Sequence, residues 1–209
     1  MFKEINKIVK TLIVADLFVN TGWGLLGPVF AIFIVQNITG GNASDAAEVA
    51  GFASLFYWTV KSVLQIPLGK YLDRNHGEID DFQFMVLGKF LTALVPFGFL
   101  ISSQAWHIYA FHVLHAIGNA MVVPSWSAIF TRHIDKGKEA YEWGLRSTFL
   151  GFGVGVAGAV GGMIAAIFGF RIILILVGSL TFVSACILTL ISKDISPYNH
   201  IFPRSPYPL

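Results

Sequence analysis

Apolar residues gather along the chain in six long segments separated by short polar stretches. The segments span residues 8–36, 49–72, 82–102, 105–131, 145–168 and 170–192. Each reaches the roughly 20 residues that a helix needs to cross a bilayer, and none shows the polar–apolar alternation of a barrel strand. Backbone amides inside lipid must be hydrogen-bonded within their own segment, as they are in a helix. The pattern therefore predicts an all-α integral membrane protein with six transmembrane helices.

The composition fits this prediction. Of 209 residues, 55% are hydrophobic and 12% are charged, and the mean hydropathy is +0.69. A soluble domain carries about 25% charged residues, so this chain cannot cover a water-facing surface. The one cysteine, Cys186, excludes an internal disulfide. We expect neither an enzyme nor a nucleic-acid-binding protein, and no cofactor or metal.

Basic residues collect on one side of the predicted helices. They precede the first helix, flank the loops after the second and fourth, and follow the sixth: Lys3, Lys7, Lys10, Lys70, Arg74, Arg132, Lys136, Lys138, Arg146, Lys193 and Arg204. The other side has Arg171 together with Asp45 and Glu48. Because Lys and Arg concentrate in cytoplasmic loops, we expect both termini in the cytoplasm, at the plasma or inner membrane of the cell. Residues 1–194 would form the bundle, and residues 195–209, which are rich in proline, a cytoplasmic tail.

Three predicted helices carry polar or aromatic residues at helical spacing on one face. These residues are Asp16, Asn20, Trp23, Lys61, Gln65, His112, His115, Asn119 and Trp126. A charged side chain costs about 3 kcal/mol at the bilayer centre unless it meets a partner or water. We therefore expect the nine residues to line one aqueous cavity, with Lys61 paired to Asp16. Lys89 lies near the inner end of the third helix, where we expect it to snorkel to the interface.

A short motif closes the second helix. Gly69, Asp73 and Arg74 are spaced as in Gly-x-x-x-Asp-Arg, and His76 and Gly77 follow. This motif resembles the loop between helices 2 and 3 of major facilitator superfamily transporters. The family pattern continues with Gly-Arg, where this chain has His76 and Gly77.

Two further stretches resemble the same family. Gly118 and Ala120 match the helix-4 signature Arg-x-x-x-Gly-x-Gly-x-Ala, in which His112 and Ala116 replace the Arg and the first Gly. In the helix-5 motif Gly-Pro-x-x-Gly-Gly, Gly158 replaces the Pro. The replaced Arg and Pro are associated with proton coupling and with antiport, so these departures weaken a proton-antiporter assignment.

Over about residues 8–192 the chain is similar to one half of such a transporter, the N-terminal half. The resemblance implies a 3+3 inverted repeat. In the family, helices 1 and 4 of each half line the cavity, helices 2 and 5 join the halves, and helices 3 and 6 face lipid. The Asp that matches Asp73 accepts hydrogen bonds from a helix N-terminus in the other half. Gly69, Asp73 and Arg74 are therefore candidates for a conformational gate.

These observations together predict a transporter that moves a small solute by alternating access. One wall of six helices cannot alternate access, and a second copy in a parallel homodimer is the simplest second wall. Small residues would let the two copies approach closely. The expected interface residues are Gly69, Gly151, Gly155, Gly158 and Gly162, with Asp73 near the partner's residues 144–148.

Several alternatives stay open. The chain could be a non-transporting scaffold or sensor module, or one subunit of a hetero-dimeric transporter. The ionisable groups of Asp16, Lys61 and His112 favour transport, because a scaffold has no reason to keep them in lipid. Lys61 could instead snorkel to an interface. His112 could titrate and couple transport to protons, or both His112 and His115 could be neutral and bonded to carbonyls or to each other.

Overall fold

The computed structural model describes residues 5–75 and 77–195, and all of its regular structure is helical. The elements are α1 (Lys7–Leu26), the 3₁₀ turn η1 (Gly27–Val29), α2 (Phe30–Asn37), α3 (Ala43–Asn75), α4 (Ile79–Leu100), α5 (Ala105–His133), α6 (Glu139–Phe168) and α7 (Phe170–Thr189). With α1 to α2 counted as one span, six helices of this part are long and apolar enough to cross a membrane. The prediction of a six-helix membrane protein is therefore confirmed. Lys3 and the tail at 196–209 lie outside the described residues.

The first span is interrupted where Pro28 stands. Proline has no amide hydrogen to donate and its ring crowds the preceding turn, so an α-helix loosens there. The chain forms the 3₁₀ turn Gly27–Val29 at this point and then resumes as α2. After α2, Gly40 and Gly41 have φ values of 60° and 97°, which glycine adopts without strain.

Two helices begin earlier than their apolar segments suggest. Asn42 caps α3, since its side-chain oxygen accepts hydrogen bonds from the amides of Ser44 and Asp45 at 3.0 and 3.3 Å. In α6 the first turn carries Glu139 and Glu142, whose negative charge suits a helix N-terminus. Both helices thus extend past the apolar core of their spans.

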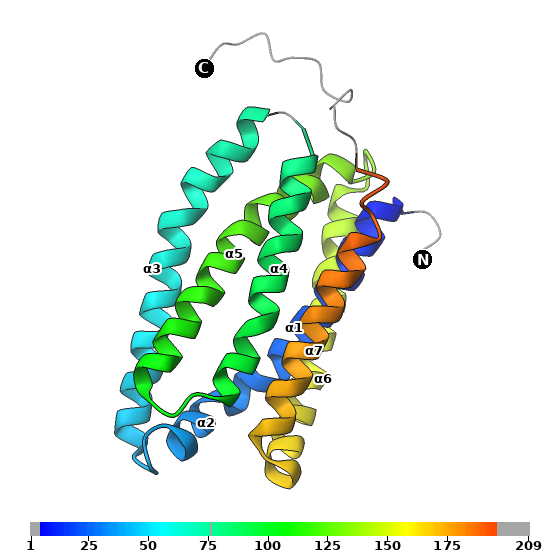
Figure 1. Cartoon of the computed structure of the whole chain (residues 1–209). Coiled ribbons are helices and arrows are strands. Elements are labelled where there is room, and N and C mark those ends of the chain that lie inside the picture. Colours follow the sequence, from blue (N-terminus) through cyan, green and yellow to red (C-terminus); the bar gives the residue numbers. More distant parts are fainter. Residues whose placement is uncertain (1–4, 76, 196–209) are drawn as a thin grey trace.

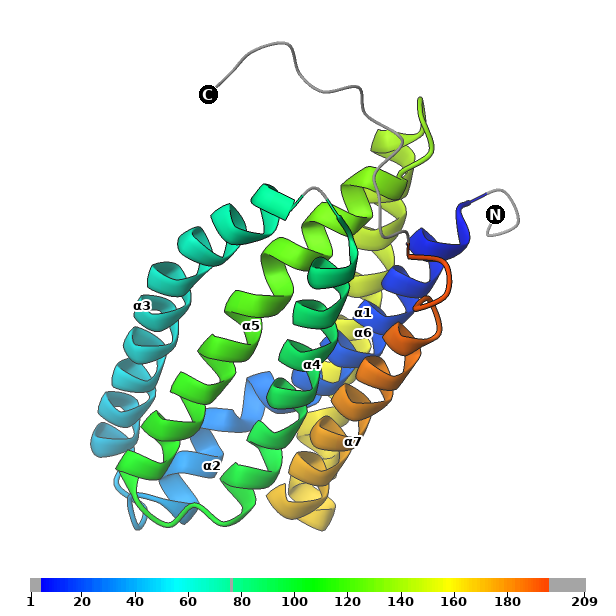
Figure 2. The ribbon, with the colours of Figure 1, turned by 45° about the horizontal axis from the view of Figure 1, so that its top comes forward.

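The helices pack in two groups (Figures 1 and 2). In one group α1 packs between α6 and α7, and in the other α5 packs between α3 and α4. The groups are joined mainly by α4 against α7. Each group takes helices from both the first and the second half of the sequence, which is compatible with an inverted repeat; the repeat itself stays a prediction.

Glycine allows the closest helix contacts. A Cβ atom on Gly88 of α4 would lie 2.5 Å from the carbonyl oxygen of Gly118 in α5. A Cβ on Gly161 of α6 would collide with the carbonyl of Leu25 in α1. Because lipid gives helices no hydrophobic reason to associate, such backbone approaches supply much of the attraction through van der Waals packing.

The helices α3 and α6 are much less buried than the other four spans. Only 11% of the most apolar window of each is buried, against 44–50% elsewhere. In Figure 1 α3 lies at the left edge of the bundle, and α6 lies in the other group, behind α1 and α7. Both present large apolar side chains outward, among them Val63 and Ile66 on α3 and Phe152 and Met163 on α6.

The contact between α1 and α6 predicts a contrast between two adjacent glycines. Gly161→Ala should lower the free energy of unfolding by about 1–3 kcal/mol, because the methyl group forces the two backbones apart. Gly162→Ala is the matched control, since a Cβ there meets nothing within 4 Å and alanine favours a helix. The measurement is the thermal unfolding midpoint of each variant in detergent. Equal midpoints would contradict the packing described here.

Candidate functional site

A cavity of about 350 Å³ opens among the helices. Its lining comes from α1, α3, α4, α5 and α6. The polar and aromatic residues that line it are Asp16, Asn20, Trp23, Tyr57, Lys89, Thr92, His115, Asn119, Trp126, Ser127, Trp143 and Arg146. An enclosure with a few convergent polar groups among aromatic walls is the usual form of a small-molecule site.

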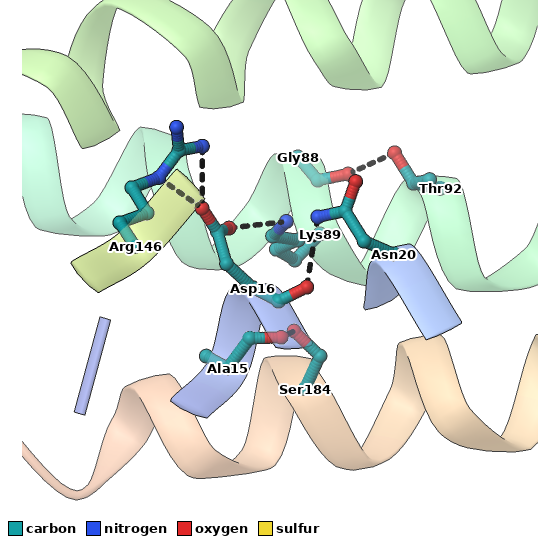
Figure 3. A network of polar contacts seen from close by, with 8 residues as sticks. All are labelled: Ala15, Asp16, Asn20, Gly88, Lys89, Thr92, Arg146 and Ser184. Carbon is teal, nitrogen blue, oxygen red and sulfur yellow. Dashed lines mark hydrogen bonds and ion pairs between the residues drawn. The ribbon is translucent and has the colours of Figure 1, made fainter. Parts of the chain in front are cut away.

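A group of three charged residues, the Asp16 cluster, consists of Asp16, Lys89 and Arg146. Arg146 donates from Nε and Nη2 to Oδ2 of Asp16, at 3.0 and 2.7 Å (Figure 3). Lys89 Nζ lies 3.6 Å from the other carboxylate oxygen, Oδ1. Asp16 and Lys89 are only 4% and 6% exposed. The cluster brings two cations from α4 and α6 to one carboxylate on α1.

Neighbouring side chains hold the backbone around this cluster (Figure 3). Asn20 donates to the carbonyl of Asp16 at 2.8 Å, and Ser184 of α7 donates to the carbonyl of Ala15 at 2.7 Å. Thr92 donates to the carbonyl of Gly88, one residue before Lys89, at 2.9 Å. Of these three bonds, the one from Ser184 joins two helices, α7 and α1, and the other two each lie within one helix.

Aromatic rings form much of the remaining wall. Trp23 stacks on His115 with ring centroids 4.1 Å apart and an interplanar angle of 8°. The Arg146 guanidinium lies 4.2 Å from the centre of the Trp126 ring, a cation–π contact. The indole Nε1 atoms of Trp23 and Trp126 are buried and have no hydrogen-bond acceptor in the part of the chain that the structure describes.

The structure brings six of the nine expected residues to the cavity: Asp16, Asn20, Trp23, His115, Asn119 and Trp126. Lys61, Gln65 and His112 are not among its lining residues. Lys61 Nζ instead lies 4.7 Å from the centre of the Trp58 ring. The Nδ1 atom of His112 lies 3.0 Å from the carbonyl oxygen of Ile108, and its ring packs against Phe30 and Phe99.

Two expectations about the charges are wrong. The cations beside Asp16 are Lys89 and Arg146, so Lys61 is not its partner. Lys89 does not snorkel, since it is buried on the bundle-facing side of α4. The ion pair with the nearby buried carboxylate of Asp16 stabilises Lys89 more than an extended conformation that reaches the membrane interface would.

The apolar pattern places Arg146 beside a loop, because the fifth apolar segment begins at residue 145. The helix begins at Glu139, so Arg146 lies about two turns inside it. The sequence pattern also misses Tyr57, Thr92, Ser127 and Trp143. For Lys89 a signal exists: it shares a helical face with the small residues Gly88 and Thr92, which mark close packing rather than lipid contact.

The proposed gate lies at the end of α3. Asp73 and Arg74 are exposed, and Asp73 has no hydrogen-bond or ion-pair partner in the described part of the chain. Residues 144–148 lie inside α6 and not at its N-terminus, so they cannot offer free amides to Asp73 as expected. Gly69 is half-buried, and a Cβ atom on it would lie 3.9 Å from the Pro124 side chain of α5, so it faces its own bundle at least in part.

Comparisons with known proteins agree with this architecture. The model of the family described as Major Facilitator Superfamily matches residues 12–205. A solved structure described as "In meso crystal structure of the POT family transporter PepTSo" superposes with a TM-score of 0.68 at 12% identity. The match covers 97% of this chain and 40% of that one, so the chain spans well under half of that transporter. A search of curated proteins found no match.

The charge arrangement of the Asp16 cluster predicts unequal effects of two substitutions. Asp16→Asn should lower the free energy of unfolding by about 3 kcal/mol, because both cations lose their buried partner. Adding Lys89→Met should recover part of this loss, since only one unpaired cation then remains. Chemical unfolding in detergent measures both, with the exposed Asp45→Asn as the control. A double variant no more stable than Asp16→Asn would contradict the cluster.

Proposed function

Because this chain belongs to the Major Facilitator Superfamily, we propose that it carries a small solute across the membrane by alternating access, with a second six-helix bundle completing the pathway. The observation that supports this most is the Asp16 cluster beside a cavity inside the membrane-spanning bundle. Charged groups in the membrane interior are costly and are retained where they serve a solute or ion pathway. A scaffold or sensor module could hold its helices together with apolar packing instead, without the cost of burying three charged groups.

The second bundle would cover α3 and α6. These two helices leave most of their apolar surface outside the bundle, unlike the other four spans. Gly151, Gly155 and Gly162 on α6 have nothing within 4 Å of a Cβ position, so they are open to a neighbour. Gly158 lies against Pro28 of its own bundle at 3.4 Å and contributes less.

The partner bundle in this proposal is a second copy of the chain. A two-fold axis along the membrane normal would bring α3 of each copy against α6 of the other, burying both exposed helices at once. Both copies would share the orientation that the basic loops indicate, with their termini in the cytoplasm of the cell membrane. On α3 the interface would use Val63 and Ile66, which point outward, rather than Gly69.

Asp73 and Arg74 would serve as the gate of this assembly. They stand exposed at the end of α3, where the partner's α6 begins with Glu139. The free amides of that first turn carry a partial positive charge and can donate hydrogen bonds to a carboxylate such as that of Asp73. A contact of this kind is worth on the order of 1 kcal/mol and would bias two conformers several-fold.

Alternating access predicts that one cavity position reacts from both sides of the membrane. We expect Asn119→Cys, in a Cys186→Ser background, to react with a membrane-impermeant thiol reagent in right-side-out and in inside-out vesicles. Cysteines at the exposed residues Asn42 and Lys136 are the controls, each reacting from one side only, Asn42 from outside and Lys136 from inside. Reaction of Asn119→Cys from one side alone would argue for a static module.

The homodimer predicts a specific cross-link. Val63→Cys on one copy and Gly151→Cys on another, each about three helical turns from the end of its helix that borders a basic loop, should form a disulfide-linked dimer on oxidation. Leu87→Cys combined with Gly151→Cys is the matched control, because Leu87 is exposed on α4, outside the proposed interface. The measurement is non-reducing electrophoresis of co-expressed variants in membranes. Equal yields from both pairs, or none from Val63, would refute the interface and favour a different partner.

A further inference from the structure

We infer that the cavity binds a small organic monocarboxylate whose flat apolar body lies among the aromatic walls. The inference rests on the proposed function and names the substrate class of the same site. The observation behind it is an imbalance: the cavity wall holds one acidic side chain, Asp16, and two basic ones, Lys89 and Arg146. With all three charged and His115 neutral, the wall carries one surplus positive charge.

The surplus charge is in a place where water compensates it poorly. Lys89 is buried, and Arg146 is partly covered by Trp126 and Trp143. A buried charge without a counter-charge is unfavourable, so an anion entering the cavity is stabilised there. A second copy of the chain would bring the same surplus with it and would not neutralise the first.

Both cations also have unused donors. The Nε and Nη2 atoms of Arg146 share one oxygen of Asp16, while Nη1 donates no hydrogen bond among the described residues. Lys89 Nζ makes a long contact of 3.6 Å to Asp16. A guanidinium presents five donors and matches a carboxylate in a two-point geometry, so Arg146 can hold Asp16 and a solute carboxylate together.

The surplus charge and the aromatic walls of the cavity exclude several chemical classes of solute. A phosphate monoester carries about −1.5 to −2 near neutral pH, which would overcompensate the one surplus charge in the cavity of a single chain. An amine would face two cations, while Asp16 is already occupied by them. Tyr57, and the face of Trp23 that does not stack on His115, give flat apolar surfaces on which a planar solute can stack.

Three probes of one shape and different charge test this inference: benzoate, benzamide and benzylamine. With the purified full chain at constant ionic strength, we expect benzoate to raise the unfolding midpoint and to give a measurable heat of binding, and the other two to do neither. Equal effects of benzamide or benzylamine, or no effect of benzoate, would overturn the inference. Displacement of bound benzoate by chloride or inorganic phosphate as readily as by unlabelled benzoate would overturn the carboxylate assignment.

Charge variants then locate the site. Arg146→Gln should weaken benzoate binding about tenfold or more, through loss of charge-assisted hydrogen bonds. Asp16→Asn should strengthen it, because it raises the surplus from one to two. If that variant is too unstable to purify, Lys89→Met gives the opposite test, because it removes the surplus charge, leaves the Asp16–Arg146 pair in place and should weaken binding. Arg171→Gln removes an exposed cation outside the cavity and should leave binding unchanged. Equal weakening by Arg171→Gln and Arg146→Gln would count against the site.

The binding experiments and the thiol-labelling experiment test the substrate class and the transport function separately. If Asn119→Cys reacts from both sides but benzoate does not bind, the substrate class is wrong and alternating access stands. If benzoate binds as expected while Asn119→Cys reacts from one side only, the monocarboxylate site stands and transport is refuted.

Discussion

One buried carboxylate, that of Asp16, ties three helices together inside the bundle. It lies on α1 and receives Arg146 from α6 and Lys89 from α4. Charges interact far more strongly in a low-dielectric interior than at a water-exposed surface, and removing one partner there is expensive. Because α1 and α6 belong to one group of helices and α4 to the other, the cluster joins the two groups.

The transmembrane spans and the helices that line the cavity could be predicted from the sequence, because each leaves a recognisable pattern of residues. Apolar length defines a membrane helix, and polar residues at helical spacing on the first and fourth spans marked the cavity wall. The partners of Asp16 were not accessible in this way. Lys61 and Lys89 are both lysines within apolar helices, and only the packing of α3 and α4 decides which one meets the carboxylate. Arg146 was hidden because helix α6 continues past its apolar segment into polar sequence.

The glycines of α6 are a second case in which the sequence does not show which residues face the bundle. Gly153 and Gly161 face α1, with Leu17 and Leu25 close by, whereas Gly151, Gly155 and Gly162 face outward. Both sets recur at helical spacing, so the sequence identifies a helix built for close contacts on two sides without saying which side belongs to the bundle. The predicted interface contained the outward set and also Gly158, which lies against Pro28 of its own bundle. Gly153 and Gly161, which were not predicted, are already used within the chain.

Helix α6 carries Arg146 near one end. Its tightest contact with α1, at Gly161, lies nearer the other end. At 1.5 Å per residue these two points are about 22 Å apart along the axis. A tilt of about 5° around the Gly161 contact would therefore move Arg146 by about 2 Å. That is enough to break its hydrogen bonds to Asp16. A change in the angle of this outward-facing helix would therefore break an ion pair in the cavity wall.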